Sequence, residues 1–311
     1  MEPSANQSEQ TVHLPVLYRE VLEGLSPVKD GIYIDGTLGG GGHSLGILRK
    51  AGPNGLVIGI DRDPTAIRRA EDRIRTSLEN DSEYQGQNLP IRFAQANYRD
   101  FPMVLNLLKI EKINGFLLDL GLSSDQLADR DRGFSFDSEG DLDLRFDPTE
   151  GLPAYELLNR WSEEKIADVI FQYGEERYSR RIARAIAERR VSEPLRKAAD
   201  LAGICRRCIP HPPGRQRIDP ATRTFQALRI AVNEELDSLK ECLETLAPFL
   251  ASKGRVAVIS FHSLEDRIVK NFFRDAADFR IITKKPIEAG EEELDQNPRS
   301  RSAKLRIAEK I

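Results

Sequence analysis

The first residues that could do chemistry form a glycine-rich turn after an acid. Asp35 ends a short apolar run and is followed by Gly36-Thr37-Leu38-Gly39-Gly40-Gly41-Gly42-His43. Glycines let the backbone approach a ligand closely, and a helix that begins there presents free N–H donors. Neither Gly-x-Gly-x-x-Gly nor Gly-x-x-x-x-Gly-Lys-Ser/Thr occurs in this turn. The turn favours an adenosyl ligand with an amino-acid tail over a pyrophosphate; the alternative is a tight connection that binds nothing.

A second acid, Asp61, ends the next apolar run, 25 residues after Gly36. In open α/β sheets an acid at this place hydrogen-bonds the ribose hydroxyls of a nucleoside ligand. A carboxylate suits this role because it can accept two hydrogen bonds from a cis-diol. The alternative is an acid stabilised by a helix N-terminus, since Asp63-Pro64 follows. We expect the ribose role.

Both acids sit in a repeated strand–helix pattern. We expect strands at 31–35, 55–61, 91–96 and 113–120, with helices at 43–50 and 64–78 between them, as in a parallel sheet. Residues 121–220 are polar, helical and rich in Arg, and a long helix over 224–250 follows. Three further strands are expected at 254–261, 279–283 and 303–308, with a loop at 286–301. The pattern predicts one α/β domain interrupted by a helical insertion of about 100 residues.

The charge is unevenly distributed. The 311 residues include 46 basic and 50 acidic side chains, a net charge of −4, which alone argues against nucleic-acid binding. Residues 175–230, however, hold 14 basic and six acidic residues, so this segment is +8 and the rest of the chain is −12. Arg177, Arg180, Arg181 and Arg184 recur every three or four residues. They indicate a phosphate-binding stripe, with a solvated helix face as the alternative.

The remaining composition narrows the class of protein. With 40% hydrophobic and 31% charged residues, the chain is neither disordered nor a disulfide scaffold. Three cysteines, including a single Cys205-x-x-Cys208, indicate a reducing, cytoplasmic location and no metal site, since structural zinc needs four ligands. No apolar run of 18 residues is present, so we expect no membrane span. Residues 1–12 are expected to be a flexible tail.

Several blocks of residues closely resemble the motifs of one known protein family. They include the 35–43 turn, Ile60-Asp61-Arg62-Asp63-Pro64, Asp119-Leu120-Gly121-Leu122-Ser123-Ser124, Arg132-Gly133-Phe134-Ser135-Phe136, Tyr173-Gly174-Glu175-Glu176-Arg177 and Ser260-Phe261-His262-Ser263-Leu264-Glu265-Asp266-Arg267. From about His13 to the C-terminus the chain resembles the RsmH (MraW) family of S-adenosylmethionine-dependent methyltransferases. These enzymes act on N4 of a cytidine in 16S rRNA, in the decoding region of the small subunit.

The resemblance implies a class I methyltransferase fold, a Rossmann-like α/β sheet with a helical insertion domain. It implies a catalytic domain at 13–125 and 221–311 and an RNA-recognition insertion at 126–220. The cofactor contacts it implies are Gly41, Gly42, His43, Asp61, Tyr98, Asp119 and Gln126. Tyr98 stands where the family usually has Phe, which keeps an aromatic face for adenine and adds a hydroxyl.

The catalytic candidates are Asp119, Ser124 and His262, and the residues single out no general base among them. Asp119 lies at the end of one predicted strand and His262 follows another, both at the carboxyl edge, where a target amine would lie. For the segment at His262 the alternative is a helix N-cap at Ser263, ahead of Glu265 and Asp266.

The expected partner is 16S rRNA within the 30S subunit. The residues expected to bind it lie in or beside the basic segment: Arg177, Arg180, Arg181, Arg184, Arg215, Arg217 and Arg223. The alternative function is a non-catalytic rRNA-binding assembly factor, which would bind no S-adenosylmethionine.

Overall fold

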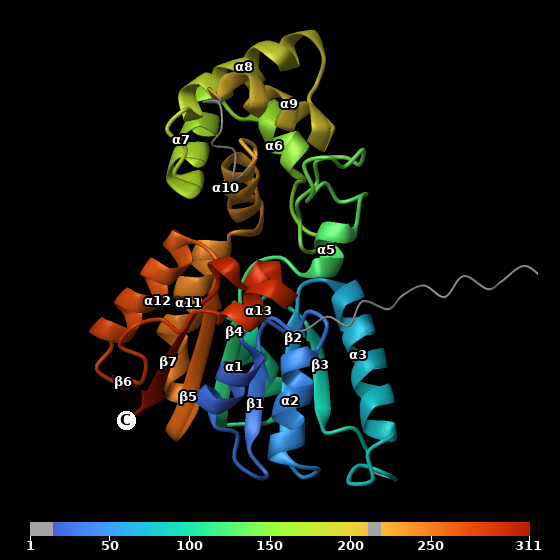
Figure 1. Cartoon of the computed structure of the whole chain (residues 1–311), viewed down its shortest axis with the longest axis vertical. Coiled ribbons are helices and arrows are strands. Elements are labelled where there is room, and N and C mark those ends of the chain that lie inside the picture. Colours follow the sequence, from blue (N-terminus) through green and yellow to red (C-terminus); the bar gives the residue numbers. More distant parts are fainter. Residues whose placement is uncertain (1–14, 87, 211–218) are drawn as a thin grey trace, which may run out of the picture.

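A seven-stranded mixed sheet forms the base of the molecule. The computed structural model describes residues 15–86, 88–210 and 219–311, so the predicted tail at 1–12 lies outside the described residues. The strand order is β3-β2-β1-β4-β5-β7-β6 (Figure 1). The bounds are β1 Ile32–Asp35, β2 Leu56–Asp61, β3 Ile91–Gln95, β4 Ile113–Asp119, β5 Leu250–Ser260, β6 Phe279–Ile281 and β7 Lys304–Lys310.

The first five strands run parallel, and β7 is antiparallel to both β5 and β6. The chain goes outward from β1 to β3 and then returns to place β4 on the other side of β1. Ligands of open α/β sheets bind at such a reversal, outside the carboxyl ends of the strands. Asp35, Asp61 and Asp119 are the last residues of β1, β2 and β4, so this order brings the three acids to one edge.

Alternating side chains of the strands bury the sheet on both faces. Tyr33, Val57 and Leu117 pack with α1 (Tyr18–Leu25), α2 (Gly42–Ala51) and α3 (Pro64–Glu79). Ile34, Ile58 and Phe116 pack on the opposite face, with α4 (Phe101–Leu108), α11 (Glu235–Leu246) and α12 (Ser263–Asp275). This arrangement follows from the two-residue period of a strand and confirms the predicted α/β class.

A helical unit with its own core stands above the carboxyl edge of the sheet (Figure 1). Its helices are α5 Ser124–Ala128, α6 Ala154–Arg160, α7 Glu163–Gly174, α8 Ser179–Ser192, α9 Ala198–Cys208 and α10 Thr222–Asn233. Phe225 and Leu228 of α10 are buried in this core. The domain boundary at residue 220 stays a prediction, and this packing favours placing the end of the unit after α10.

Two local expectations were wrong. The predicted helix over 224–250 is interrupted at Glu234, whose φ of 52° ends α10 before α11 begins. The predicted loop at 286–301 contains α13 (Glu291–Gln296) and the 3-10 helix η3 (Pro298–Ser302). Three consecutive acids, Glu291, Glu292 and Glu293, occupy the first turn of α13, where the helix dipole stabilises them. Two short 3-10 helices, η1 (Tyr98–Asp100) and η2 (Ala247–Phe249), complete the fold.

Within the described ranges, no helix is both long and apolar enough to cross a membrane.

Candidate active site

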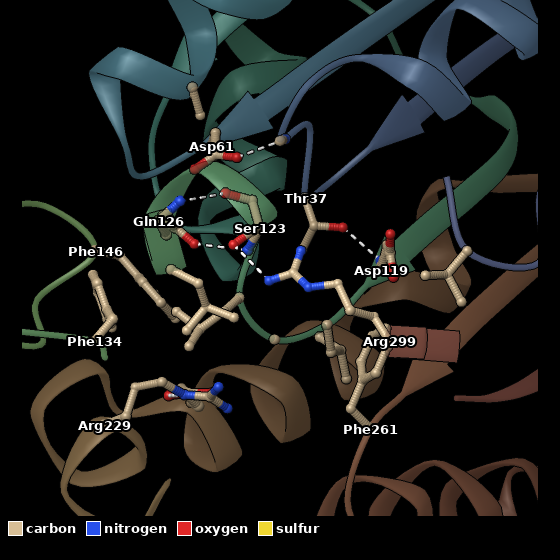
Figure 2. Close-up of a pocket in the computed structure, with 18 of the residues that line it drawn as sticks. Thr37, Asp61, Asp119, Ser123, Gln126, Phe134, Phe146, Arg229, Phe261 and Arg299 are labelled. Carbon is tan, nitrogen blue, oxygen red and sulfur yellow. Dashed lines mark hydrogen bonds and ion pairs between the residues drawn. The ribbon is translucent and has the colours of Figure 1, made fainter. Parts of the chain in front are cut away.

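A cavity of about 460 Å³ lies between the carboxyl edge of the sheet and the helical unit (Figure 2). Residues of the glycine-rich turn and of the β2 and β4 ends form one side of it. Phe134, Phe146 and Arg229 approach from the helical unit, and Phe261 and Arg299 from the C-terminal part of the chain. Both parts of the molecule therefore build the pocket.

The glycine-rich turn is bonded directly to Asp61. Gly39 adopts φ +48°, and its N–H donates to Oδ2 of Asp61 at 2.8 Å, while the N–H of Asp63 donates to Oδ1 at 2.9 Å. Burial raises the pKa of Asp61 to about 6, against the effect of these two hydrogen bonds. The acid is thus oriented toward the cavity by the backbone on both sides of it.

Two other glycines of the turn lie where neighbouring atoms leave little room for a side chain. A Cβ on Gly42 would lie 2.4 Å from Cγ of Pro15, and one on Gly41 would lie 3.0 Å from Ile74. Gly41 also has φ +71° as the N-cap of α2. Gly42 and His43 line the cavity, and Gly41 lies behind them against α3.

Thr37 joins the ends of β1 and β4. Its hydroxyl accepts a 2.5 Å hydrogen bond from the N–H of Asp119, as Figure 2 shows. Asp35 is buried below, where its carboxylate accepts from Ser44 Oγ at 2.7 Å and from the N–H of Thr37 at 3.3 Å. Burial raises the pKa of Asp35. Asp119 is therefore held at the pocket by its backbone, with its carboxylate left for other partners.

His43 and Asp119 face each other across the pocket floor. Nε2 of His43 lies 3.6 Å from Oδ2 of Asp119, and the imidazole stacks on Tyr18 with a centroid distance of 6.0 Å. Within the described part of the chain, both ring nitrogens of His43 and Oδ1 of Asp119 are buried without a hydrogen-bond partner. Buried polar atoms in this state are places where a bound ligand would restore hydrogen bonds.

Gln126 links the β4 loop to the start of α3. It forms a capping box with Ser123 at the beginning of α5, and its Nε2 donates to Oδ2 of Asp63 at 3.3 Å. The same carboxylate oxygen accepts from Arg132, whose other amino group donates to the carbonyls of Arg145 and Phe146 at 2.6 and 2.7 Å. Ser124 begins α5, and its side chain lies outside what the structure describes.

Tyr98 lines the cavity from η1. Its hydroxyl donates to the main-chain carbonyl of Glu235 at 3.2 Å, and burial raises the pKa of Tyr98 well above its usual value. The extra hydroxyl therefore has a structural partner at the base of α11 and leaves the ring free to line the pocket.

His262 lies at the pocket wall and is the N-cap of α12, the position that the alternative interpretation of this segment gave to Ser263. Oε2 of Glu265 accepts from the N–H of Phe261 at 2.8 Å, and Oε1 lies 3.2 Å from Nε2 of His262. Burial would raise the pKa of Glu265, but the contacts with His262 and Arg229 lower it overall. Ser263 instead donates to Oε2 of Glu175 at 2.6 Å, which ties α12 to the end of α7.

Ligand atoms of Glu235, His262 and Glu265 lie within 4.8 Å of one another. Arg229, however, binds both carboxylate oxygens of Glu235, at 2.8 and 2.9 Å. A guanidinium held this closely competes with any cation for Glu235, so we interpret the cluster as an ion-pair network between α10, α11 and α12. Cys205 and Cys208 are buried thiols, and burial raises the pKa of Cys205 to about 12.

The predicted RNA-binding arginines divide into groups. Arg177 and, on α8, Arg180, Arg181 and Arg184 are exposed on the side opposite the buried Ile182 and Ile186. Arg223 is exposed and donates to the carbonyl of Glu175 at 3.1 Å. Arg215 and Arg217 lie outside the described residues.

The neighbouring arginines of α8 have structural roles. Arg190 donates to the carbonyls of Leu158 and Trp161, and Arg189 pairs with Glu193 at 2.7 Å. The stripe therefore combines exposed cations with cations that hold the helices together.

Sequence reasoning missed several pocket residues. Thr37 and Phe261 belong to the motifs that carry the family resemblance but had no predicted role, and no role was predicted for Arg229, Glu235 and Arg299. For Arg299 a signal existed: it is a cation in the acidic 286–301 stretch. Its position could not be read from that stretch, because it depends on η3 lying over the pocket.

Known proteins resemble this chain over nearly its whole length. The model of the MraW methylase family matches residues 10–311. The chain is 46% identical to the ribosomal RNA small subunit methyltransferase H of Heliobacterium mobile, covering 96% of this chain and 99% of that protein. The proteins of the same name from Rhodopirellula baltica and Synechocystis sp. are 46% and 47% identical, covering 99% and 96% of this chain and 94% and 93% of theirs.

Proposed function

The chain belongs to the MraW methylase family, and we propose that it methylates the exocyclic N4 of one cytidine in the decoding region of 16S rRNA within the 30S subunit. It is an S-adenosylmethionine-dependent methyltransferase, and its substrate is the RNA of the small ribosomal subunit. Because the proposed substrate belongs to the ribosome, we propose that the reaction takes place in the cytoplasm.

The residues at the pocket fit this cofactor. Asp61 can accept hydrogen bonds from a ribose diol, and Tyr98 offers a ring face for adenine beside it. The unpartnered oxygen of Asp119 suits an ammonium donor, and the buried nitrogens of His43 lie next to it. We assign cofactor binding to Gly42, His43, Asp61, Tyr98, Asp119 and Gln126, with Gly41 shaping the turn from behind.

Asp119 is our candidate for handling the target amine. When bound, S-adenosylmethionine supplies an electrophilic methyl group. The amine of cytosine is a weak nucleophile because its lone pair is delocalised into the ring. A carboxylate that accepts from its N–H group draws the nitrogen toward tetrahedral geometry and can take the proton as the bond forms. Asp119 is one-quarter exposed, at the edge of the pocket, whereas His262 is 10% exposed and faces Glu265.

The helical unit is proposed to hold the RNA. Its exposed arginines include three on α8, at the end of the unit far from the sheet (Figure 1), and Phe134 and Phe146 line the pocket from the same unit. A cytidine must leave its stack to enter such a site, and aromatic surfaces help to receive it. Arg177, Arg180, Arg181, Arg184 and Arg223, together with Arg215 and Arg217, are the proposed phosphate contacts.

The observation that carries the proposal is the position of Asp61 and Asp119 on one cavity, roofed by a basic helical unit. The test supplies a labelled methyl donor with 30S particles and, in parallel, with deproteinised 16S rRNA, and then maps the modified nucleotide. We expect N4-methylcytidine at one position with particles and little with bare RNA. A label on another base or on protein would contradict the proposed target.

The matched control is Asp119→Asn, which keeps the size of the side chain and removes its charge. We expect it to lose most of the activity while still folding. The alternative, an assembly factor without catalysis, predicts that the wild-type protein shows no heat of binding with S-adenosylmethionine.

A further inference from the structure

Glu175 connects the helical unit to the helix that follows the last parallel strand. It directly follows α7, and its carboxylate accepts from Oγ of Ser263 at 2.6 Å and from Nη2 of Arg267 at 3.2 Å, both on α12. Its main-chain carbonyl accepts from Arg223 of α10 at 3.1 Å. In Figure 1, α7 stands above α12. One residue therefore joins three helices, and the proposed function gives it no role.

The backbone of Glu175 has a conformation that favours glycine. As the C-cap of α7 it has φ 50° and ψ 33°, in the left-handed region. Helices often end on a glycine in this region, because a side chain is strained there. Strained residues persist where the surrounding structure fixes them, and they are concentrated at functional sites. The glutamate is thus present despite its backbone conformation, which points to the contacts of its side chain with α12.

The first turn of α12 forms one wall of the pocket. Phe261, His262 and Glu265 all line the cavity. Oε2 of Glu265 accepts from the N–H groups of Phe261 and His262, at 2.8 and 3.3 Å, so hydrogen bonds connect the three residues. Ser263 directly follows His262 and is exposed, and its hydroxyl carries the contact from this wall to Glu175. A shift at Glu175 would therefore be transmitted to the pocket wall.

The hydrogen bond from Ser263 is the stronger of the two contacts that Glu175 makes with α12. It lowers the pKa of Glu175, and Arg267 and Arg223 lower it further, against the opposing effect of burial. A hydrogen bond to an ionised acceptor is stronger than one between neutral groups. The ion pair with Arg267, in contrast, is exposed, with 47% of the Glu175 side chain and 58% of the Arg267 side chain accessible. Such exposed pairs contribute little by themselves.

We propose that Glu175 is a positioning residue for methyl transfer, because it holds Ser263 and thereby fixes the pocket wall at His262 relative to the helical unit. This inference rests on the proposed function. The cofactor is assigned to the sheet edge and the RNA to the helical unit, so the methyl group and the target amine meet in line only when the two parts are fixed to each other. A displacement of about 1 Å between reacting groups can lower a rate by about a hundredfold.

The test uses Glu175→Gly, which removes the side chain and suits the left-handed backbone. Lost contacts and relieved strain oppose each other, so we expect a melting temperature close to that of the wild type. We expect kcat on 30S particles to fall by about tenfold or more. The dissociation constants for S-adenosylmethionine and for 30S particles should change by less than about twofold.

Two further variants serve as controls. Glu175→Gln keeps an oxygen that can accept from Ser263, and it should retain more activity than Glu175→Gly. Lys109→Gly makes the same backbone change at the C-cap of α4, where φ is 57°, at a residue that does not line the pocket. It should behave as the wild type does.

Ser263→Ala tests whether the effect passes through the hydrogen bond. It should lower kcat as Glu175→Gly does, and the double variant should lose no more activity than the weaker of the two single variants, since both changes remove one interaction. Effects that multiply in the double variant would overturn the proposal. An unchanged kcat in Glu175→Gly would also overturn it, as would a loss confined to the affinity for 30S particles.

Hydrogen–deuterium exchange separates this inference from the proposed function, because it requires no methylation. The N–H groups of Glu265 and Asp266 are bonded to His262, at 3.4 and 3.2 Å, and should exchange faster in Glu175→Gly than in the wild type. If the wild type methylates 30S particles and this exchange is unchanged, Glu175 does not hold the wall, and this inference alone is wrong. If the wild type methylates no rRNA, the proposed function is wrong and the positioning role in that reaction is wrong with it.

Discussion

Arg62 donates a 2.8 Å hydrogen bond from Nη1 to the main-chain carbonyl of Asn233, 171 residues further along the chain. Arg62 directly follows the proposed ribose acid, and Asn233 is the last residue of α10. The side chain of Asn233 in turn accepts from the N–H of Phe146 at 2.7 Å and donates to the carbonyl of Leu144 at 2.7 Å. The cofactor edge of the sheet and the base of the helical unit are thereby joined through one buried amide.

Replacing Asn233 by Ala should therefore weaken this junction. The buried N–H of Phe146 and carbonyl of Leu144 would lose their partners, at a cost on the order of 3 kcal/mol. We expect a fall of several degrees in the melting temperature, together with weaker activity on 30S particles. Lys240→Ala, on the exposed face of α11, is the control and should melt as the wild type does. An unchanged melting temperature for Asn233→Ala would show that the junction does not stabilise the fold.

Cofactor affinity should depend on pH through Asp61. Its pKa of about 6 means that the carboxyl is protonated below pH 6 in the free protein, whereas ribose hydroxyls donate best to the ionised form. Affinity for S-adenosylmethionine should decrease below pH 6, by up to about tenfold per pH unit. Asp61→Asn should bind more weakly at pH 7.5 and lose this dependence, as measured by calorimetry between pH 5 and 7.5. The same slope in the variant would assign the titration to another group.

The raised pKa of Asp61 also acts on the stability of the free protein. A carboxyl whose pKa is higher in the folded state than its ordinary value of 3.8 contributes stability that is fully present below that value. This contribution is lost as the pH rises through about 6. The difference in melting temperature between the wild type and Asp61→Asn should change across this window, and a constant difference would argue against the shift.

Tyr98→Phe tests which part of this side chain serves the cofactor. The substitution removes one hydrogen bond, to the carbonyl of Glu235, and keeps the ring. We expect a loss of about 1 kcal/mol in the free energy of unfolding and little change in cofactor affinity. Tyr98→Ala should in addition weaken binding. If Tyr98→Phe alone weakens binding strongly, the hydroxyl contacts the cofactor.

Substitution of the exposed arginines of α8 should weaken RNA binding and leave cofactor binding unchanged. Arg180→Gln combined with Arg181→Gln should weaken binding to 30S particles and lower the salt dependence of binding by about two charges. Affinity for S-adenosylmethionine should stay unchanged because neither side chain lines the pocket. Arg189→Gln on the same helix is the matched control, since Arg189 pairs with Glu193. If Arg189→Gln weakens RNA binding as much per charge removed, the affinity depends on net charge and not on the exposed arginines of α8.

The sequence by itself determined the sheet-forming half of the protein and the location of its candidate ligand-binding edge. Asp35, the glycine-rich turn and Asp61 lie in continuous strand–turn–helix segments, so local patterns were sufficient to place them. The uneven charge likewise located the exposed arginines of α8. These features depend on residues that are neighbours along the chain.

Only the tertiary structure decided which distant side chains meet. Three examples join segments that are separate in the sequence. The hydroxyl of Thr37 accepts from the N–H of Asp119, and Arg299 reaches the same pocket from η3. Arg190 donates to two carbonyls of the helical unit. A sequence states that a threonine or an arginine is present, but its partner depends on how the elements pack. The break at Glu234 lies beside such contacts, since the side chain of Asn233 bonds backbone groups of residues 144 and 146 that only packing brings to it.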